Sequence, residues 1–445
     1  MQLEDAGLFG VGKGKDDFTF DYILKVDNNW GQFKSLYGKN LRPVVIKEVE
    51  KMLLCRDPKG GFATYLCLSC GETKIIPFSC NSRLCSRCGK KYADIWAEEL
   101  ANYLLPCIHR HIVLTISDKL WSYFIDNPGL QKLLLDTAAE TMKEVIKLSN
   151  KGRRKLKCGQ VLVLHPFGDD LKANFHVHIL ITEGGLDGEG KWHSTVYLDY
   201  ETIRKKWQYN ILTALKKEPV LRVDKKLAAI IDWCFRYRKN GFYIFAKRRL
   251  PPTTNRKGTI RYIGRYVRHP AISNRRIIGY DGKTVTFTYE EYRRKFQKTL
   301  PKFEFIDAVL QHVTESQFKV VRRFGLYARR ASASHQTAYE ALSKESVSEI
   351  PTVFLRKQEV GTLPGFNWRE NVIRYTGEDP LSCPKCGNEM ELFQITYPDG
   401  YGGYKTVGGY DWLIKKGVLD VLEEETLPPE ETQVSEQEGS QLYLF

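Results

Sequence analysis

Six of the eleven cysteines in this 445-residue chain fall within 34 residues, between Cys55 and Cys88. Such a cluster restricts what the segment can fold into, because closely spaced thiolates either pair as disulfides or converge on a metal. The chain does not start with a basic-then-apolar secretion signal, so a reducing compartment and a metal site are expected. The segment therefore predicts a small zinc-binding domain over residues 46–105, after a lead-in of residues 1–45.

Two Cys-x2-Cys pairs in this segment have the spacing at which a zinc ion takes two ligands from one tight turn. Four thiolates close a structural site, but the spacing alone leaves the choice of ligands open. We predict one zinc held by Cys67, Cys70, Cys85 and Cys88. The other cysteines are either buried or form a second zinc site that includes a distant Cys-x2-Cys pair; they are Cys55, Cys80, Cys383 and Cys386.

Charge is unevenly distributed along the chain. The net formal charge is +15, yet residues 420–445 contain eight acidic residues and no Lys or Arg, so residues 1–419 carry +23. A basic body favours a polyanionic partner, and nucleic acid is the first candidate. The alternative is a basic protein without such a partner. No apolar run reaches the roughly 18 residues needed to span a membrane, so we expect a cytoplasmic protein without a membrane partner.

The apolar periodicity predicts a mixture of helices and strands. Leu130–Leu148 has apolar residues at helical spacing. Ile112–Ile116, Gln160–His165 and Phe175–Thr182 are apolar or β-branched runs typical of buried strands. Short turns join successive strands, including one at Asp281 and Gly282. The pattern favours an α+β fold with a largely antiparallel sheet flanked by helices over a doubly wound parallel sheet.

Two histidines stand two positions apart in one of these strands. His176 and His178 therefore share a face, and the apolar Val177 between them points toward the core. Two imidazoles so placed can chelate a divalent cation. His165 ends the preceding strand and can reach the same metal if the two strands pair as a hairpin. Its competitors as third ligand are Asp169, Asp170 and Gln160.

The same spacing occurs at His109 and His111. Here the intervening residue is Arg110, which would have to face the core. A metal-binding pair favours an apolar residue between its ligands, so we predict a polar entry to a strand at this position instead of a metal site.

Two tyrosines lie four residues apart in a strongly basic stretch. Tyr262 and Tyr266 would share one face of a helix, and residues 236–276 contain 13 Lys or Arg and no acidic residue. Basic side chains here would contact DNA phosphates; the candidates are Arg248, Arg249, Arg261, Arg265, Arg268, Arg275 and Arg276. A phenolate attacks phosphorus if Mg²⁺ or Mn²⁺ withdraws charge from the phosphate. The interleaved aromatic rings could stack on unpaired bases.

Together these segments resemble the HUH endonucleases, in which two histidines flank a bulky hydrophobe. The resemblance is closer to the two-tyrosine transposases of rolling-circle insertion sequences. The matching stretches, in the order of that family, are Cys67–Cys88, His165–Lys172, His176–His178, Tyr262–Tyr266, Ala271–Arg276 and Arg323–Tyr327.

The resemblance implies an HUH nuclease domain over residues 106–330, with a central antiparallel sheet flanked by helices. It implies nicking of single-stranded DNA at transposon ends, leaving a 5′-phosphotyrosine, in a prokaryotic, nucleoid-associated protein. Tyr262 and Tyr266 would be the nucleophiles, and His176 and His178 would bind the catalytic Mg²⁺ or Mn²⁺. The third ligand, His165, is an inference from hairpin geometry. DNA hairpins at the transposon ends are a further candidate partner.

The C-terminal part carries two more features. We assign residues 331–419 to an accessory region that contains Cys383 and Cys386, and residues 420–445 to an acidic, disordered tail. The tail ends in a peptide similar to the one by which bacterial proteins bind the replication sliding clamp; its anchors are Gln441, Leu442, Leu444 and Phe445. No Gly-x4-Gly-Lys-[Ser/Thr] phosphate loop occurs, so a host helicase is expected to separate the strands.

Two alternative functions stay open at this point. One is a replication initiator or relaxase of a rolling-circle plasmid, which would share the chemistry. The other is a non-enzymatic zinc-ribbon DNA-binding regulator, in which the histidines and tyrosines are structural.

Overall fold

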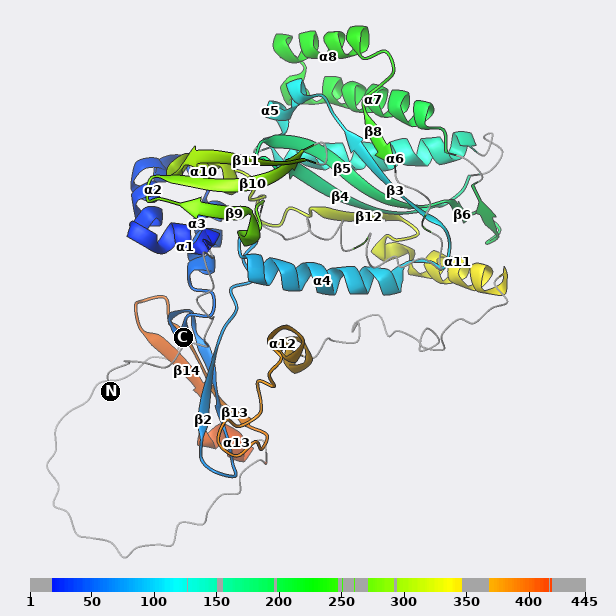
Figure 1. Cartoon of the computed structure of the whole chain (residues 1–445). Coiled ribbons are helices and arrows are strands. Elements are labelled where there is room, and N and C mark those ends of the chain that lie inside the picture. The colour runs from blue at the N-terminus through cyan, green and yellow to red at the C-terminus, as the bar shows by residue number, and fades with distance from the viewer. Residues whose placement is uncertain are drawn as a thin grey trace, which may run out of the picture. The chain divides into compact units, whose positions relative to one another are not determined.

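The computed structural model describes residues 18–125, 127–149, 155–195, 198–246, 250, 260, 271–291, 294–345, 368–415 and 417. The chain forms two compact units (Figure 1). The first contains residues 1–60 and 77–378, and the second contains residues 61–76 and 379–445. The cysteine-rich segment that we predicted as a single domain therefore contributes to both units.

A five-stranded sheet forms the centre of the first unit. Its strand order, β12-β4-β5-β3-β8, places β5 in the middle. All its pairings are antiparallel, which confirms the predicted α+β class. The strands are β3 (His109–Thr115), β4 (Gly159–Phe167), β5 (Ala173–Thr182), β8 (Ile244–Ala246) and β12 (Val321–Gly325).

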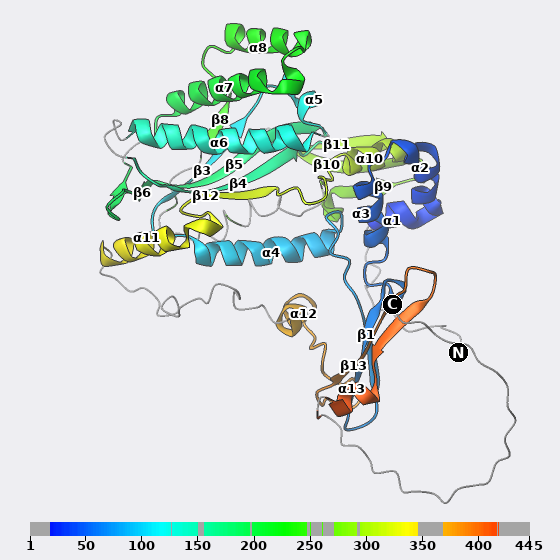
Figure 2. The ribbon, with the colours of Figure 1, turned by 180° about the vertical axis from the view of Figure 1, so that it is seen from behind.

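Helices cover both faces of this sheet (Figures 1 and 2). One face packs against α5 (Trp121–Phe124), α6 (Pro128–Ser149), α7 (Tyr200–Lys217) and α8 (Lys225–Tyr237). The other face packs against α4 (Ser86–Tyr103) and α11 (Ser332–Glu345). Because side chains alternate along a strand, Leu162 and Ile179 belong to the first core, whereas Val163 and Leu180 belong to the second.

A second sheet of the first unit packs on the N-terminal helices. Its order is β11-β10-β9, and the predicted turn at Asp281 and Gly282 joins β9 to β10. The Asp281 carboxylate accepts hydrogen bonds from the backbone of Lys283 and Thr284, which lower the pKa of Asp281 to about 2. The elements are α1 (Phe20–Lys25), α2 (Asn29–Tyr37), α3 (Pro43–Leu53), β9 (Ile277–Tyr280), β10 (Thr284–Glu291), β11 (Arg294–Pro301) and α10 (Lys302–Leu310).

The segment Arg323–Tyr327 lies at the end of β12, and two of its residues have specific packing roles there. Gly325 has a positive φ of 60°, and a Cβ there would lie 1.7 Å from the carbonyl oxygen of Cys158, so only glycine fits. The chain then places Tyr327 in the core, fully buried, over Gly159. The Tyr327 hydroxyl lies 2.6 Å from Nε2 of His109 and accepts a hydrogen bond from the backbone of Leu105. Gly325 and Tyr327 of this segment therefore have structural roles.

The second unit is a four-stranded sheet of order β14-β13-β1-β2. Its strands come from the two ends of the chain, because β1 pairs antiparallel with β13, for example Ala63 with Ile395. The elements are β1 (Phe62–Leu66), β2 (Thr73–Pro77), β13 (Glu391–Pro398), β14 (Tyr404–Gly408) and α13 (Tyr410–Lys415). Besides these three sheets, the described part of the chain contains a two-stranded sheet of β6 (Gly184–Leu186) and β7 (Trp192–Ser194), and the helix α12 (Trp368–Thr376).

No helix in the described part of the chain is long and apolar enough to cross a membrane.

Candidate active site and metal centres

Three histidines meet on one face of the central sheet. The register of β4 and β5 places His165 directly opposite His176, and His178 follows on the same face. The ligand nitrogens of the three side chains lie within 4.8 Å of one another. His165 and His178 are buried, and His176 is partly exposed. The structure thus brings together the three residues that we predicted as metal ligands.

The distances fit a shared metal ion. Nδ1 of His165 lies 3.2 Å from Nε2 of His176. Two nitrogens bound at about 2.1 Å to one metal lie roughly 3.0–3.4 Å apart, depending on the coordination geometry. The Nδ1–H of His176 donates to the carbonyl oxygen of Asn174 over 2.6 Å, which leaves the lone pair on Nε2 facing His165.

Burial keeps the imidazoles of His165 and His176 in the form that binds metal. It lowers the pKa of His176 to about 4, and it lowers the pKa of His165 well below the ordinary value, with the neighbouring histidines adding to the shift. A neutral imidazole carries the lone pair that a metal needs.

The competing third ligands point elsewhere. Gln160 donates to the carbonyl oxygen of Ala139 in α6, on the opposite face of the sheet. Asp170 accepts from the backbone of Lys172 within the turn between β4 and β5. Asp169 lies 3.8 Å from the guanidinium of Arg276. None of the three belongs to the histidine group.

A fourth histidine adjoins the site. His109, Arg110 and His111 begin β3, as predicted, and none of them belongs to the metal-ligand groups found among the described residues, but all three are buried. Arg110 can lie inside because it forms an ion pair with the buried Glu183. Nε2 of His111 lies 2.9 Å from Nδ1 of His178. Sequence reasoning missed His111 because its approach to His178 depends on the pairing of β3 with β5.

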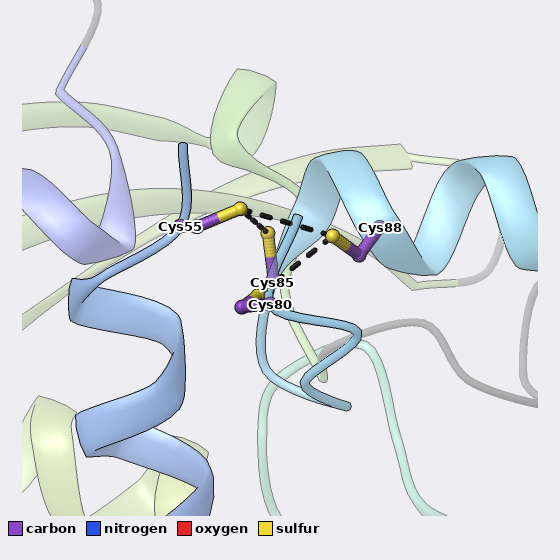
Figure 3. Close-up of side chains that lie close together, drawn as sticks. All are labelled: Cys55, Cys80, Cys85 and Cys88. Atoms are coloured by element: carbon purple, nitrogen blue, oxygen red, sulfur yellow. Dashed lines mark hydrogen bonds between the residues drawn. The ribbon is translucent and has the colours of Figure 1, made fainter. Parts of the chain in front are cut away.

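Four cysteines of the first unit form a compact cluster (Figure 3). Cys55 follows α3, Cys80 lies in the loop between β2 and α4, Cys85 is the N-cap residue of α4, and Cys88 lies in its first turn. The Sγ···Sγ distances are 3.8 Å for Cys55–Cys88 and 3.7 Å for both Cys80–Cys88 and Cys55–Cys85. Two sulfurs on a tetrahedral zinc at about 2.3 Å are about 3.75 Å apart, so the cluster has the dimensions of a closed zinc site.

The second unit holds a second such cluster, formed by Cys67, Cys70, Cys383 and Cys386. The Sγ···Sγ distances are 3.5 Å for Cys67–Cys386 and 3.6 Å for Cys70–Cys383. Both Cys-x2-Cys turns close in the same way, because the amide of a following glycine donates to the first cysteine's carbonyl oxygen. These glycines are Gly71, with φ 71°, and Gly387, with φ 77°.

The ligand sets therefore differ from the predicted sets. We expected the Cys67 and Cys85 pairs to share one zinc, but the structure divides them between two clusters. Strand β2 separates these pairs, and its five extended residues carry the chain about 16 Å onward instead of turning it back. Cys55 and Cys80 join the Cys85 pair, and the distant pair at Cys383 joins Cys67 and Cys70.

Several predicted residues lie outside the described part of the chain. They are Tyr262, Tyr266, Arg248, Arg249, Arg261, Arg265, Arg268, Gln441, Leu442, Leu444 and Phe445. Of the predicted DNA contacts, Arg275 is exposed. Arg276 donates hydrogen bonds to the carbonyl oxygens of Thr288 and Asp169, so it already has protein partners.

Comparison with known proteins assigns the chain to a family. A family model described as "Putative transposase" matches residues 159–335, and one described as "Transposase zinc-binding domain" matches residues 25–116. The transposase for insertion sequence element IS801 of Pseudomonas savastanoi pv. phaseolicola is 31% identical over 361 residues, covering 79% of this chain and 83% of the relative. This chain belongs to the IS91 family of transposases.

A second relative of this transposase is the "Putative transposase y4qJ" of Sinorhizobium fredii, 25% identical over 367 residues, or 79% of this chain and 88% of the relative. No solved structure matches the transposase. The two family models cover the histidine strands and the first cysteine cluster, whereas Cys383 and Cys386 lie outside both matched segments. Half of the ligands of the second cluster therefore come from a part of the transposase that neither model covers.

Proposed function

We propose that this transposase nicks single-stranded DNA at transposon ends and transfers strands through 5′-phosphotyrosine intermediates. The observation that carries the proposal is the convergence of His165, His176 and His178 on one face of the sheet. This group supplies ligands for a divalent cation at a site where one member, His176, is partly exposed. A nucleic-acid phosphate can therefore approach it.

A buried residue directly precedes the segment that carries the two proposed nucleophiles. Ile260 is buried in the core formed by Val161, Val163 and Leu180, on the same sheet face as the histidines. Tyr262 follows Ile260 by two residues in the sequence. Tyr266 follows four residues later.

The reaction exchanges one phosphoester bond for another. In the proposed step the Tyr262 or Tyr266 phenolate oxygen forms a bond to the scissile phosphorus. The bond from phosphorus to the 3′ oxygen breaks, and that oxygen leaves as a hydroxyl after taking up a proton. The bound cation would withdraw charge from the phosphate. Because the phosphotyrosine ester keeps the energy of the phosphodiester, a later 3′-hydroxyl can attack it, and two tyrosines allow two such links.

The ligand chemistry also sets an expectation for the metal. A group of three imidazoles binds Mn²⁺ more strongly than Mg²⁺, which prefers carboxylate and water ligands. We therefore expect Mn²⁺ to support cleavage at lower concentrations than Mg²⁺.

The decisive experiment traps the covalent intermediate. Full-length protein is incubated with 5′- or 3′-labelled single-stranded DNA from the ends of its own element. Samples stripped with EDTA are resupplied with Zn²⁺ alone, or with Zn²⁺ together with Mn²⁺ or Mg²⁺, because EDTA also removes structural zinc. A denaturation-resistant adduct should form only with Mn²⁺ or Mg²⁺ and should disappear in the Tyr262→Phe/Tyr266→Phe double variant.

Tyr209→Phe is the matched control, because Tyr209 is exposed on α7, the helix on the far face of the sheet. Its adduct should match the wild type. Tight DNA binding without any adduct, on both ends and with each metal, would instead support the non-enzymatic zinc-ribbon regulator.

A further inference from the structure

The segment Ala271–Arg276 begins five residues after Tyr266 and is held at several points. Its first two residues, Ala271 and Ile272, are buried in a core that also contains Cys85 of the first cysteine cluster and the adjacent Leu84. The same core contains Leu171 from the turn between β4 and β5. This segment therefore packs against residues next to both the first cysteine cluster and the strands that carry the histidines.

Asn274 connects the segment to the cysteine cluster. Its side-chain oxygen accepts a hydrogen bond from the hydroxyl of Ser86 over 3.0 Å, and Ser86 directly follows Cys85 at the start of α4. The same oxygen accepts from the backbone N–H of Phe20 over 3.3 Å. A backbone N–H can only donate, so the carboxamide must present its oxygen here.

Arg276 connects the same segment to the histidine strands. Its guanidinium donates to the carbonyl oxygen of Asp169, in the turn between β4 and β5, and through Nε to Thr288 over 2.7 Å. In that turn Leu171 has a positive φ of 66°, unfavourable for a branched side chain, and burial of the side chain compensates for it. The turn is thus constrained where Arg276 contacts it.

We propose that Asn274 and Arg276 are positioning residues that fix the end of the tyrosine-bearing segment relative to both the first zinc site and the histidine strands. This inference rests on the proposed function. Ile260, two residues before Tyr262 in the sequence, is buried in the core of the central sheet, and residues 271–276 make the contacts described above. Cys55, Cys80, Cys85 and Cys88 would hold a zinc ion there, and that ion would support cleavage without touching the phosphate, because it would fix the start of α4, where Ser86 donates to Asn274.

The test compares substitutions that remove or retain the acceptor. Asn274→Leu has similar volume and no acceptor, whereas Asn274→Asp retains it. A displacement of about 1 Å at a reacting group can cost about 100-fold in rate, so Asn274→Leu should slow single-turnover adduct formation by about that factor. Its DNA dissociation constant should change by less than about twofold, since only the reacting geometry is altered. Asn274→Asp should restore the rate.

Asn210→Leu is the matched control. This substitution also removes two side-chain hydrogen bonds, which Asn210 on α7 donates to Thr141 and Glu144 in α6. These bonds lie on the face of the sheet opposite to the histidines. Its single-turnover rate should equal that of the wild type. The proposal is overturned if Asn274→Leu cleaves at the wild-type rate, or if Asn210→Leu is slowed as much as Asn274→Leu.

A second measurement separates this inference from the proposed function. Hydrogen–deuterium exchange of the peptide 271–277 should accelerate in Asn274→Leu and in Cys85→Ser, but not in Cys386→Ser, which affects the other cysteine cluster. If the wild type forms no adduct, the proposed function fails, but the exchange rates still test whether the first cysteine cluster holds residues 271–276 in place. Unchanged exchange in Asn274→Leu and Cys85→Ser would refute that structural connection.

Discussion

The division of eight cysteines into two zinc sites can be tested by removing ligands in pairs. The Sγ···Sγ distances of 3.5–3.8 Å convert to metal–sulfur distances of about 2.1–2.3 Å for a tetrahedral ion, the value expected for zinc thiolates. The wild type should therefore bind two zinc ions per chain, with only sulfur ligands at about 2.3 Å in X-ray absorption spectra.

Two double variants distinguish the observed clusters from the sets predicted by sequence. Cys67→Ser/Cys383→Ser removes two ligands from one observed cluster, so one zinc should remain per chain. Cys67→Ser/Cys85→Ser removes one ligand from each cluster, so both sites should be lost or strongly weakened. The sequence-based sets predict the reverse: loss of both in the first variant and of one in the second.

Zinc content after gel filtration, measured by atomic emission against protein concentration, provides the readout. Cys107→Ser is a control for general effects of removing a thiol, because Cys107 is buried in the α4 core and belongs to neither cluster. Two zinc ions retained by Cys67→Ser/Cys383→Ser, or one retained by Cys67→Ser/Cys85→Ser, would refute the observed division.

Three further predictions concern other parts of the chain. His111→Ala should weaken Mn²⁺ binding by about 10–100-fold, because Nε2 of His111 lies 2.9 Å from Nδ1 of His178 and a hydrogen bond between them orients the His178 ring; titration calorimetry with an unchanged affinity would contradict this. Burial lowers the pKa of His312 from 6.5 to about 4, so the unfolded chain takes up a proton at a higher pH than the folded chain does. The contribution of His312 to the free energy of unfolding should therefore fall by about 3 kcal/mol as the pH drops from 6.5 to 4. In urea titrations, the free energy of unfolding of His312→Gln should fall by about that much less than the wild-type value over this pH range, and an identical pH dependence would exclude His312 as a cause. Deletion of residues 441–445 should abolish binding to the bacterial sliding clamp in surface plasmon resonance, and undiminished binding would eliminate the proposed clamp peptide.

The sequence predicted features that depend on local patterns. The two-residue spacing of His176 and His178 and the short hairpin back to His165 were sufficient to place three imidazoles together, because both follow from strand geometry. The turn at Asp281 was also predictable from a local pattern, because Asp281 and Gly282 form a typical hairpin turn between two strands. Features that depend on the pairing of distant strands could not be predicted in this way. The approach of His111 to His178, for example, depends on the register in which β3 pairs with β5.

The cysteines show the same limit. A Cys-x2-Cys turn can be recognised in any sequence, but which two turns bind the same metal depends on the path of the chain between them. The pairs at Cys67 and Cys85 were assigned to one zinc because they are neighbours in the sequence. In the structure β2 separates these two pairs, and the pair before β13 lies beside Cys67 although Cys386 is 319 residues further along the chain. Nothing in the periodicity around Cys383 indicates that β13 adds to the sheet of β1.

The pairing of β1 with β13 has a consequence for the order of synthesis. At translation rates of about 5–20 residues per second, Cys67 and Cys70 emerge roughly 16–64 seconds before Cys386. During that interval two thiols and one edge of β1 await their partners, while all four cysteines of the other cluster are present once Cys88 has emerged. A nascent chain that stalls or is truncated before Cys383 would thus retain the first zinc site and present an open strand edge with two reactive thiols, which would make such products prone to oxidation and aggregation.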